Sequence, residues 1–232
     1  MYKHFLKRLI GFIGALTAIL ILSPLFIVVM IWLHFANKGA GVFFLQDRIG
    51  RGGRFFRCLK FKSMTDERDA NGHLLPDKER LTSVGKLIRK TSLDELPQLF
   101  NILKGDMAFI GPRPLPLSYF PYYSAEEMHR YDVRPGMTGW AQVNGRTTLD
   151  WSDRIRFDLE YVNKLTLWLD IKVFFLTVYK VFKHENVGLD KSGENSFFEY
   201  REAQWAAEGR YDLIEEAYRK SGRTKPSKYL QK

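Results

Sequence analysis

One uncharged stretch, residues 9–37, decides the architecture of this chain; it reads LIGFIGALTAILILSPLFIVVMIWLHFAN. It is long enough to cross a bilayer, for which about 20 apolar residues suffice. Proline lacks a backbone donor and clashes with the preceding turn, so Ser23-Pro24 predicts a bend at the middle of the stretch. We therefore predict a long apolar helix with a central break.

Basic residues flank this stretch on both sides, and positive charge beside a membrane segment favours the cytoplasmic face. A straight spanning helix can place only one flank there. A helix-break-helix that enters the bilayer and returns places both there, so we predict this re-entrant form, with a kinked spanning helix as the alternative. A cleaved signal peptide is disfavoured, because the apolar core is too long and no small-residue cleavage pattern follows it. The flanking residues are Lys3, Lys7 and Arg8 on one side and Lys38, Arg48, Arg51, Arg54, Arg57, Lys60 and Lys62 on the other.

Length and composition predict one membrane element and one further domain. The chain has 232 residues, enough for a hydrophobic core, and a formal net charge of +10. Its first 62 residues hold ten lysines and arginines against the single acid Asp47. Such charge suits an anionic membrane surface or phosphorylated ligands. Nucleic acid is not expected, because no nucleic-acid-binding motif accompanies the charge. The single cysteine, Cys58, excludes an intramolecular disulfide and a multi-cysteine metal site.

The remaining pattern predicts an α+β domain that is mostly helical, with short strands joined by a glycine turn at residues 49–53. Residues 165–183 are strongly apolar but carry four charges. Their longest uncharged run is therefore too short to span a bilayer. They form either an amphipathic helix in the membrane interface or a helix buried in the core. The predicted strands are residues 42–46 and 55–61, and the predicted helices are 83–89, about 94–103, 150–184 and 197–220.

Two adjacent carboxylates, Asp94 and Glu95, stand in the segment TSLDELPQ at residues 91–98. Helix capping is one explanation, because Ser92 and Glu95 have capping-box spacing and Pro97 places a helix start near Asp94. Chemistry is the other: one carboxylate could attack phosphorus while its neighbour holds a divalent cation. Basic residues in or beside rigid Gly/Pro segments favour chemistry, since they could neutralise developing phosphate charge. These residues are Lys60, Lys62, Arg89, Arg113, Arg134 and Arg146.

Several long motifs resemble the bacterial sugar transferase family, the monotopic phosphoglycosyl transferases that begin glycan assembly. The resemblance covers about residues 1–188, in order and without large gaps. The length is similar to that of the small members, such as the undecaprenyl phosphate N,N'-diacetylbacillosamine 1-phosphate transferases, which keep only the re-entrant helix and the catalytic domain. The motifs are KFKSM at 60–64, SLDELPQL at 92–99, NILKGDM at 101–107, IGPRP at 110–114, RPGMTGWAQVNGR at 134–146 and the spacing Asp158-x-x-Tyr161.

The resemblance implies a reaction in which a UDP-sugar and a polyprenyl (undecaprenyl) phosphate give a polyprenyl-diphosphate-sugar and UMP, with Mg2+. It implies that Asp94 is the nucleophile of a covalent aspartyl phospho-sugar intermediate and that Glu95 is the metal ligand. Asp158 is a candidate for positioning. Candidates for phosphate or carboxylate contacts are Lys60, Arg89, Arg113 and Arg146. The family's Ser-Pro break is present as Ser23-Pro24, which favours a re-entrant helix with a compact catalytic domain on the cytoplasmic face of the inner membrane.

These interpretations divide the chain into a re-entrant helix (1–38), a catalytic domain (39–188) and a helical C-terminal extension (189–232). The extension has no counterpart in the motifs, and a homodimer contact, a membrane-surface helix and a dock for a downstream glycosyltransferase all stay open. Two other functions are an inactive membrane-anchored scaffold and a lipid- or nucleic-acid-binding module. An inactive scaffold is expected to lack the acid pair or the arginines, which are present here. A binding module would not explain why Asp94 and Glu95 are adjacent. Of the possible sugars, the small-member resemblance favours an N-acetylated or diacetylated amino sugar over plain glucose or galactose.

Overall fold

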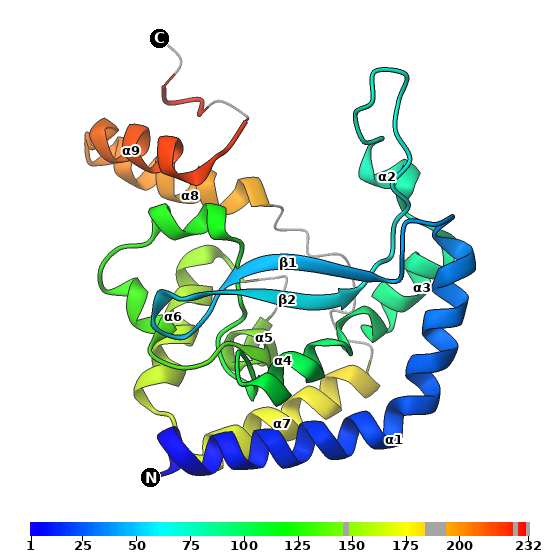
Figure 1. Cartoon of the computed structure of the whole chain (residues 1–232). Coiled ribbons are helices and arrows are strands. Elements are labelled where there is room, and N and C mark those ends of the chain that lie inside the picture. Colours follow the sequence, from blue (N-terminus) through cyan, green and yellow to red (C-terminus); the bar gives the residue numbers. More distant parts are fainter. Residues whose placement is uncertain (146–148, 184–193, 225–226, 231–232) are drawn as a thin grey trace.

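The computed structural model describes residues 1–145, 149–183, 194–224 and 227–230. It is mostly helical, with two small two-stranded sheets (Figure 1). The long helix α1 (Lys7–Ala36) borders the body along its lower and one lateral side in Figure 1, and the C-terminal helices lie at the opposite end. The predicted class, mostly helical with short strands, is confirmed.

Helix α1 continues through Pro24 but bends near its middle, so that its two halves follow different sides of the body (Figure 1). The proline has no N–H for the Leu20 carbonyl one turn earlier. The Ser23 hydroxyl donates to that carbonyl oxygen instead, at 2.8 Å. An orphaned carbonyl would be costly in an apolar environment, so Ser23-Pro24 is a bend whose backbone stays partnered.

One face of α1 belongs to the core of the body. Its buried residues pack with Phe61, Ile88 and Ile102. Among the described residues, α1 is the one helix long and apolar enough to cross a membrane. Its buried residues are Gly11, Ala15, Phe26, Val29 and Leu33, and its exposed apolar residues include Leu9, Ile13, Leu20, Ile21, Ile27, Val28, Ile31, Trp32 and Phe35.

The predicted hairpin is confirmed as β1 (Phe43–Ile49) and β2 (Phe55–Phe61), antiparallel, with Phe43 opposite Phe61 and Ile49 opposite Phe55. The free edge of β2 is closed by a side chain. Asn101 of α4 (Gln98–Lys104) accepts from the Leu59 amide at 2.9 Å and donates to the Arg57 carbonyl at 2.8 Å. This pairing fixes the strand that carries Lys60 against α4.

A second sheet, not predicted from the sequence, pairs β3 (Ala108–Ile110) in parallel with β4 (Gly136–Thr138). The two segments cross very closely: a Cβ on Gly136 would lie 2.2 Å from the Gly111 amide nitrogen. The remaining helices before the C-terminal region are α2 (Asp77–Arg80), α3 (Ser83–Lys90), α5 (Trp140–Gly145), α6 (Trp151–Asn163) and α7 (Leu167–Phe182).

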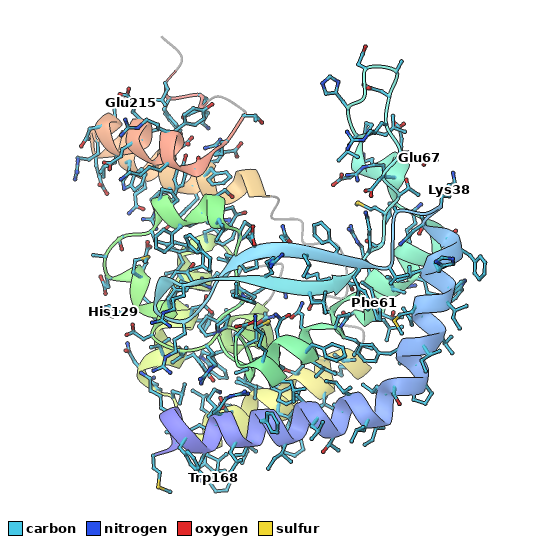
Figure 2. The ribbon with its side chains drawn as sticks, viewed as in Figure 1. Lys38, Phe61, Glu67, His129, Trp168 and Glu215 are labelled. Carbon is cyan, nitrogen blue, oxygen red and sulfur yellow. The ribbon has the colours of Figure 1, made fainter. Side chains whose placement is uncertain are left out.

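Helix α7 has one buried face and one exposed apolar face. Asp170 and Val173 are buried, whereas Trp168 is 78% exposed and lies on the side of the body that α1 borders (Figure 2). Phe174 and Phe175 are exposed as well. The segment therefore contributes to the core and also presents an exposed apolar face of the kind that an interfacial helix needs; its place in the membrane interface stays a prediction.

The C-terminal region contains two helices, α8 (Glu194–Ala207) and α9 (Tyr211–Ser221), so the prediction of one helix over 197–220 is wrong. The break falls at Gly209, whose φ of 72° ends a helix at little cost. Phe197 and Phe198 pack into an aromatic cluster with Tyr119 and Tyr122. These two helices thus share a core with the body. Glu202 is buried there and bonds Tyr122, Arg223 and Ser227.

Candidate active site

A cavity of about 350 Å³ contains the Asp94-Glu95 pair and is also lined by four of the other predicted site residues, Lys60, Arg89, Arg113 and Asp158. Its lining comes from β2, α3, the turn before α4, the loop after β3, the 3-10 turn Glu127–Tyr131, α5 and α6. The charged residues that line it are Lys60, Lys86, Arg89, Lys90, Asp94, Glu95, Arg113, Arg130, Arg154 and Asp158. Cations outnumber carboxylates among them, so the cavity suits a ligand with several negative charges.

The acid pair lies on a short 3-10 turn, Leu93–Glu95, and not in the first turn of the predicted helix over 94–103. The α-helix begins only at Gln98, after Pro97. Ser92 is left-handed, with a φ of 56°, and caps nothing with its side chain. The capping interpretation of this segment is therefore wrong. A non-glycine residue in that conformation costs free energy, and such strain is common where side chains are held for function.

Glu95 is fixed by two cations. Its Oε1 accepts from Lys60 Nζ at 2.9 Å and from Arg113 Nη2 at 2.8 Å. Burial alone would raise the pKa of Glu95, but Arg113 and Lys60 outweigh it and hold this pKa well below its usual range. Glu95 therefore stays ionised, and one of its two carboxylate oxygens accepts both hydrogen bonds.

Asp94 has the opposite environment. Its carboxylate accepts no hydrogen bond from the residues that the structure describes, although it lines the same cavity. Burial and the neighbouring Glu95 charge raise the pKa of Asp94, against the lowering effect of Lys60, Arg89 and Arg113. Two adjacent acids with divergent environments are a common arrangement where one group reacts and the other supports it.

Arg89 reaches the cavity from the last turn of α3. Its Nε donates to the Ser63 hydroxyl at 2.8 Å. Helix α3 approaches this segment so closely that a Cβ on Gly85 would lie 1.9 Å from the Ser63 carbonyl oxygen. Glycine at position 85 is thus a condition for placing Arg89 beside the acids.

Asp158 is buried on α6 and binds Arg130, at 2.5 Å from Nη2 and 3.2 Å from Nε. Arg130 Nη2 also donates to the Arg113 carbonyl at 3.1 Å. Asp158 therefore acts on the cavity through Arg130, which helps to fix the segment that carries the Glu95 partner Arg113. Sequence reasoning missed Arg130. The available signal was Asp158 itself, a carboxylate on the apolar face of a predicted helix beside Tyr161 and Val162. A buried carboxylate needs a cationic partner, but the sequence does not show which residue that partner is.

Two other predicted basic residues, Lys62 and Arg134, do not line this cavity. Lys62 pairs with Asp66 at 2.5 Å and donates to the Ala40 carbonyl. Arg134 lines different cavities near α1. Arg146 lies outside the described residues.

Comparison with known proteins agrees with the motifs. The model of the bacterial sugar transferase family matches residues 2–184. The uncharacterized sugar transferase EpsL of Bacillus subtilis is 46% identical over 187 residues, which are 78% of this chain and 90% of EpsL. The undecaprenyl-phosphate galactose phosphotransferase of Salmonella typhimurium is 38% identical over 200 residues, 79% of this chain and 42% of that protein.

A third relative is the UDP-N-acetylgalactosamine-undecaprenyl-phosphate N-acetylgalactosaminephosphotransferase of Aeromonas hydrophila. It is 41% identical over 182 residues, which are 75% of this chain and 43% of that protein. The chain thus matches nearly all of EpsL but spans less than half the length of the Salmonella and Aeromonas relatives. With a family match over most of its residues, the chain belongs to the bacterial sugar transferase family.

Proposed function

We propose that this protein transfers a sugar 1-phosphate from a UDP-sugar to membrane undecaprenyl phosphate and releases UMP, as the first membrane step in assembling a glycan. One observation carries the proposal: an unbonded carboxylate, Asp94, lies beside a carboxylate fixed by two cations, in a cavity where cations predominate. The names of the Salmonella and Aeromonas relatives support the acceptor. The glycan is a glycoprotein glycan, capsule, O-antigen or exopolysaccharide.

The proposed chemistry has two displacements at phosphorus. The Asp94 carboxylate attacks the β-phosphorus of the UDP-sugar, and the bond from that phosphorus to the bridging oxygen breaks, so that UMP leaves. A phosphate oxygen of undecaprenyl phosphate then attacks the same phosphorus and frees the Asp94 carboxylate. Lys60, Arg89 and Arg113 stabilise the charge that develops on the phosphoryl oxygens.

Mg2+ is the metal that we propose for this site. Among the described residues there is no group of three or more His, Cys, Asp or Glu side chains that could hold a metal by itself. Mg2+ does not need one, since it is usually bound by one or two carboxylates together with water and substrate phosphates. Asp94 and the second oxygen of Glu95 fit this requirement. When bound, the ion supplies neutralisation of phosphate charge.

Replacement of Glu95 tests its metal role. We expect Glu95→Gln to lower UMP release at low Mg2+ by roughly 10- to 100-fold and to recover partly at high Mg2+, because one ligand is weakened while the nucleophile remains. The measurement is the Mg2+ dependence of UMP release. Glu67→Gln is the control, since Glu67 also pairs with a lysine, Lys38, but lies outside the cavity. An unchanged Mg2+ dependence of Glu95→Gln contradicts the metal role.

The proposed placement is a re-entrant α1 with the body on the cytoplasmic face. Contacts at both ends of the helix support it. Lys7 and Tyr2 contact Asp170 of α7, and Asn37 at the other end donates to the Lys62 carbonyl at 2.7 Å. A helix whose two ends bind one body cannot place these ends on opposite sides of a bilayer without breaking one set of contacts.

Pro24 is the residue to change for a test of topology. Pro24→Ala should restore a straight helix and shift the N-terminus towards the other face, because alanine supplies the missing donor. Labelling of Lys3→Cys and Lys38→Cys in sealed vesicles reads the two faces. Equal accessibility is expected in the parent protein, and opposite accessibility there contradicts the re-entrant placement. Leu25→Ala is the neighbouring control, which should leave the topology unchanged.

The reaction itself is tested by UMP release from a panel of UDP-sugars with Mg2+ and undecaprenyl phosphate. We expect one UDP-sugar to be preferred, and we expect it to carry an N-acetylated amino sugar. Contacts between the sugar and the pocket, worth about 1–3 kcal/mol each, set this selectivity. Without acceptor, UMP should appear in a burst of at most one per protein. Failure of every UDP-sugar to release UMP contradicts the proposed function.

A further inference from the structure

A second cationic region lies beside the start of α1, and its lining shares no residue with the cavity of the acid pair. Two neighbouring cavities form it and have Arg51 and Arg134 in common. One is lined also by Lys3, Lys7 and Arg8 of the α1 region. The other, of about 520 Å³, is lined also by Arg54 and by the glycines of the β1–β2 turn.

The positive charge of this region is not balanced locally. Burial and the nearby Arg51 and Arg8 charges lower the pKa of Arg134. The two acids in the linings have other partners: Asp106 pairs with Lys104 at 3.3 Å, and Asp132 contacts His129 at 3.1 Å. Lys7 is paired with Asp170, so the arginines are the excess cations, and an anion from outside the chain would neutralise them.

Two of the guanidinium groups are held in place by backbone. Arg8 donates to the carbonyls of Ile102 and Leu103 at 2.7 and 2.8 Å, at the C-terminal end of α4. Arg134 Nε donates to the Gly105 carbonyl at 2.8 Å. A guanidinium has five donors, so each retains capacity for a ligand. Such fixed donors lose little freedom when they bind an oxyanion.

Two further arginines of the region have side chains without a polar partner among the described residues. Arg51 and Arg54 are exposed in the turn between β1 and β2, and neither has an ion pair or a side-chain hydrogen bond within the described part of the chain. Together with Arg134 they line the larger cavity on one side. The region thus combines fixed donors with free ones.

An apolar surface borders the region. Phe5 is 63% exposed, Leu9 and Phe12 of α1 are exposed too, and the Arg8 guanidinium lies 5.6 Å from the centre of the Phe12 ring. A soluble anion makes no use of this surface, whereas a phospholipid presents a phosphate and acyl chains together. We propose that Arg8, Arg51, Arg54 and Arg134 bind the phosphate of an anionic phospholipid headgroup, which seats the start of α1 at the membrane surface.

The test uses the full-length protein in nanodiscs of phosphatidylcholine with increasing fractions of phosphatidylglycerol at low salt. A ligand that binds the folded state raises the unfolding temperature, so this temperature should rise with the phosphatidylglycerol fraction. The double variant Arg51→Gln/Arg54→Gln should lose most of the rise. Each charge near a membrane surface corresponds to about a fivefold change in binding, so the pair should weaken it roughly 25-fold.

Arg57→Gln is the matched control, because Arg57 is an exposed arginine of the same hairpin that lines neither cavity. It should keep the full rise. An unchanged rise in the double variant, or an equal loss in Arg57→Gln, overturns the proposal. Inorganic phosphate added to pure phosphatidylcholine nanodiscs should have little effect; a full rise with phosphate and none with phosphatidylglycerol would assign a soluble anion and overturn it as well. UMP release by the same samples reports separately on the proposed function.

Discussion

Asp94→Asn should abolish UMP release and prevent any covalent phospho-sugar adduct. An amide nitrogen or oxygen at this position cannot replace the carboxylate as a nucleophile. Among the described residues, the other acids that line the cavity, Glu95 and Asp158, are both paired with arginine. We expect a loss of at least about 10³-fold, in line with the removal of a covalent nucleophile. Intact-mass measurement after incubation with a UDP-sugar detects the adduct.

Stability separates this prediction from a structural role for Asp94. Its pKa is raised in the folded protein, so above the unfolded pKa, near pH 4, ionisation of Asp94 opposes folding. Asp94→Asn removes that cost, and the variant should be as stable as the parent at pH 7 or more stable. A cap would predict a loss of about 1 kcal/mol with activity retained.

Asp94→Glu is the companion variant, because it keeps the charge and moves the oxygens by one methylene. It should remain folded and lose most activity, since attack on phosphorus tolerates little displacement. An adduct on Asp94→Asn, or UMP release near the parent rate, would reject Asp94 as the nucleophile.

Asp158→Asn should give the largest loss of stability. Arg130 is 2% exposed and Asp158 4% exposed, so the substitution leaves a buried guanidinium without its counter-ion. Loss of one partner of such a pair costs about 3–5 kcal/mol. Unfolding by denaturant in detergent measures the change. Asp153→Asn on the same helix is the control; its ion pair with Arg156 is exposed and worth about 0–1 kcal/mol.

The double variant Asp158→Leu/Arg130→Met distinguishes stability from positioning. Apolar replacement of both partners should recover much of the free energy of unfolding. UMP release should stay low, because the Arg113 carbonyl has lost the donor that fixes it. Full recovery of activity together with stability would show that Asp158 and Arg130 only support the fold.

Much of this fold follows from local pattern. The apolar run with Ser23-Pro24, the glycine turn before Phe55–Phe61 and the helix Ser83–Lys90 are all predictable, because each is decided by neighbours in sequence. The parallel pairing of β3 with β4 is not, since its strands are short and separated by a long connection.

The candidate site shows the same limit. Asp94 and Glu95 could be found from their motif. Their place on a 3-10 turn, however, depends on the left-handed conformation of Ser92, which the sequence does not predict. Arg130 was missed because its partner Asp158 lies 28 positions away, and tertiary packing alone selects that pairing.

The inner face of α1 has a further consequence for engineering. Phe26, Val29 and Leu33 pack with Phe61 and Ile88, so this helix cannot be removed or exchanged as an inert anchor would be. Its deletion would open the core beneath β2 and α3, the elements that carry Lys60 and Arg89, and a soluble truncated enzyme is not to be expected. In the proposed placement the same contacts set the height of Asp94 above the bilayer, and hence its reach to a lipid phosphate.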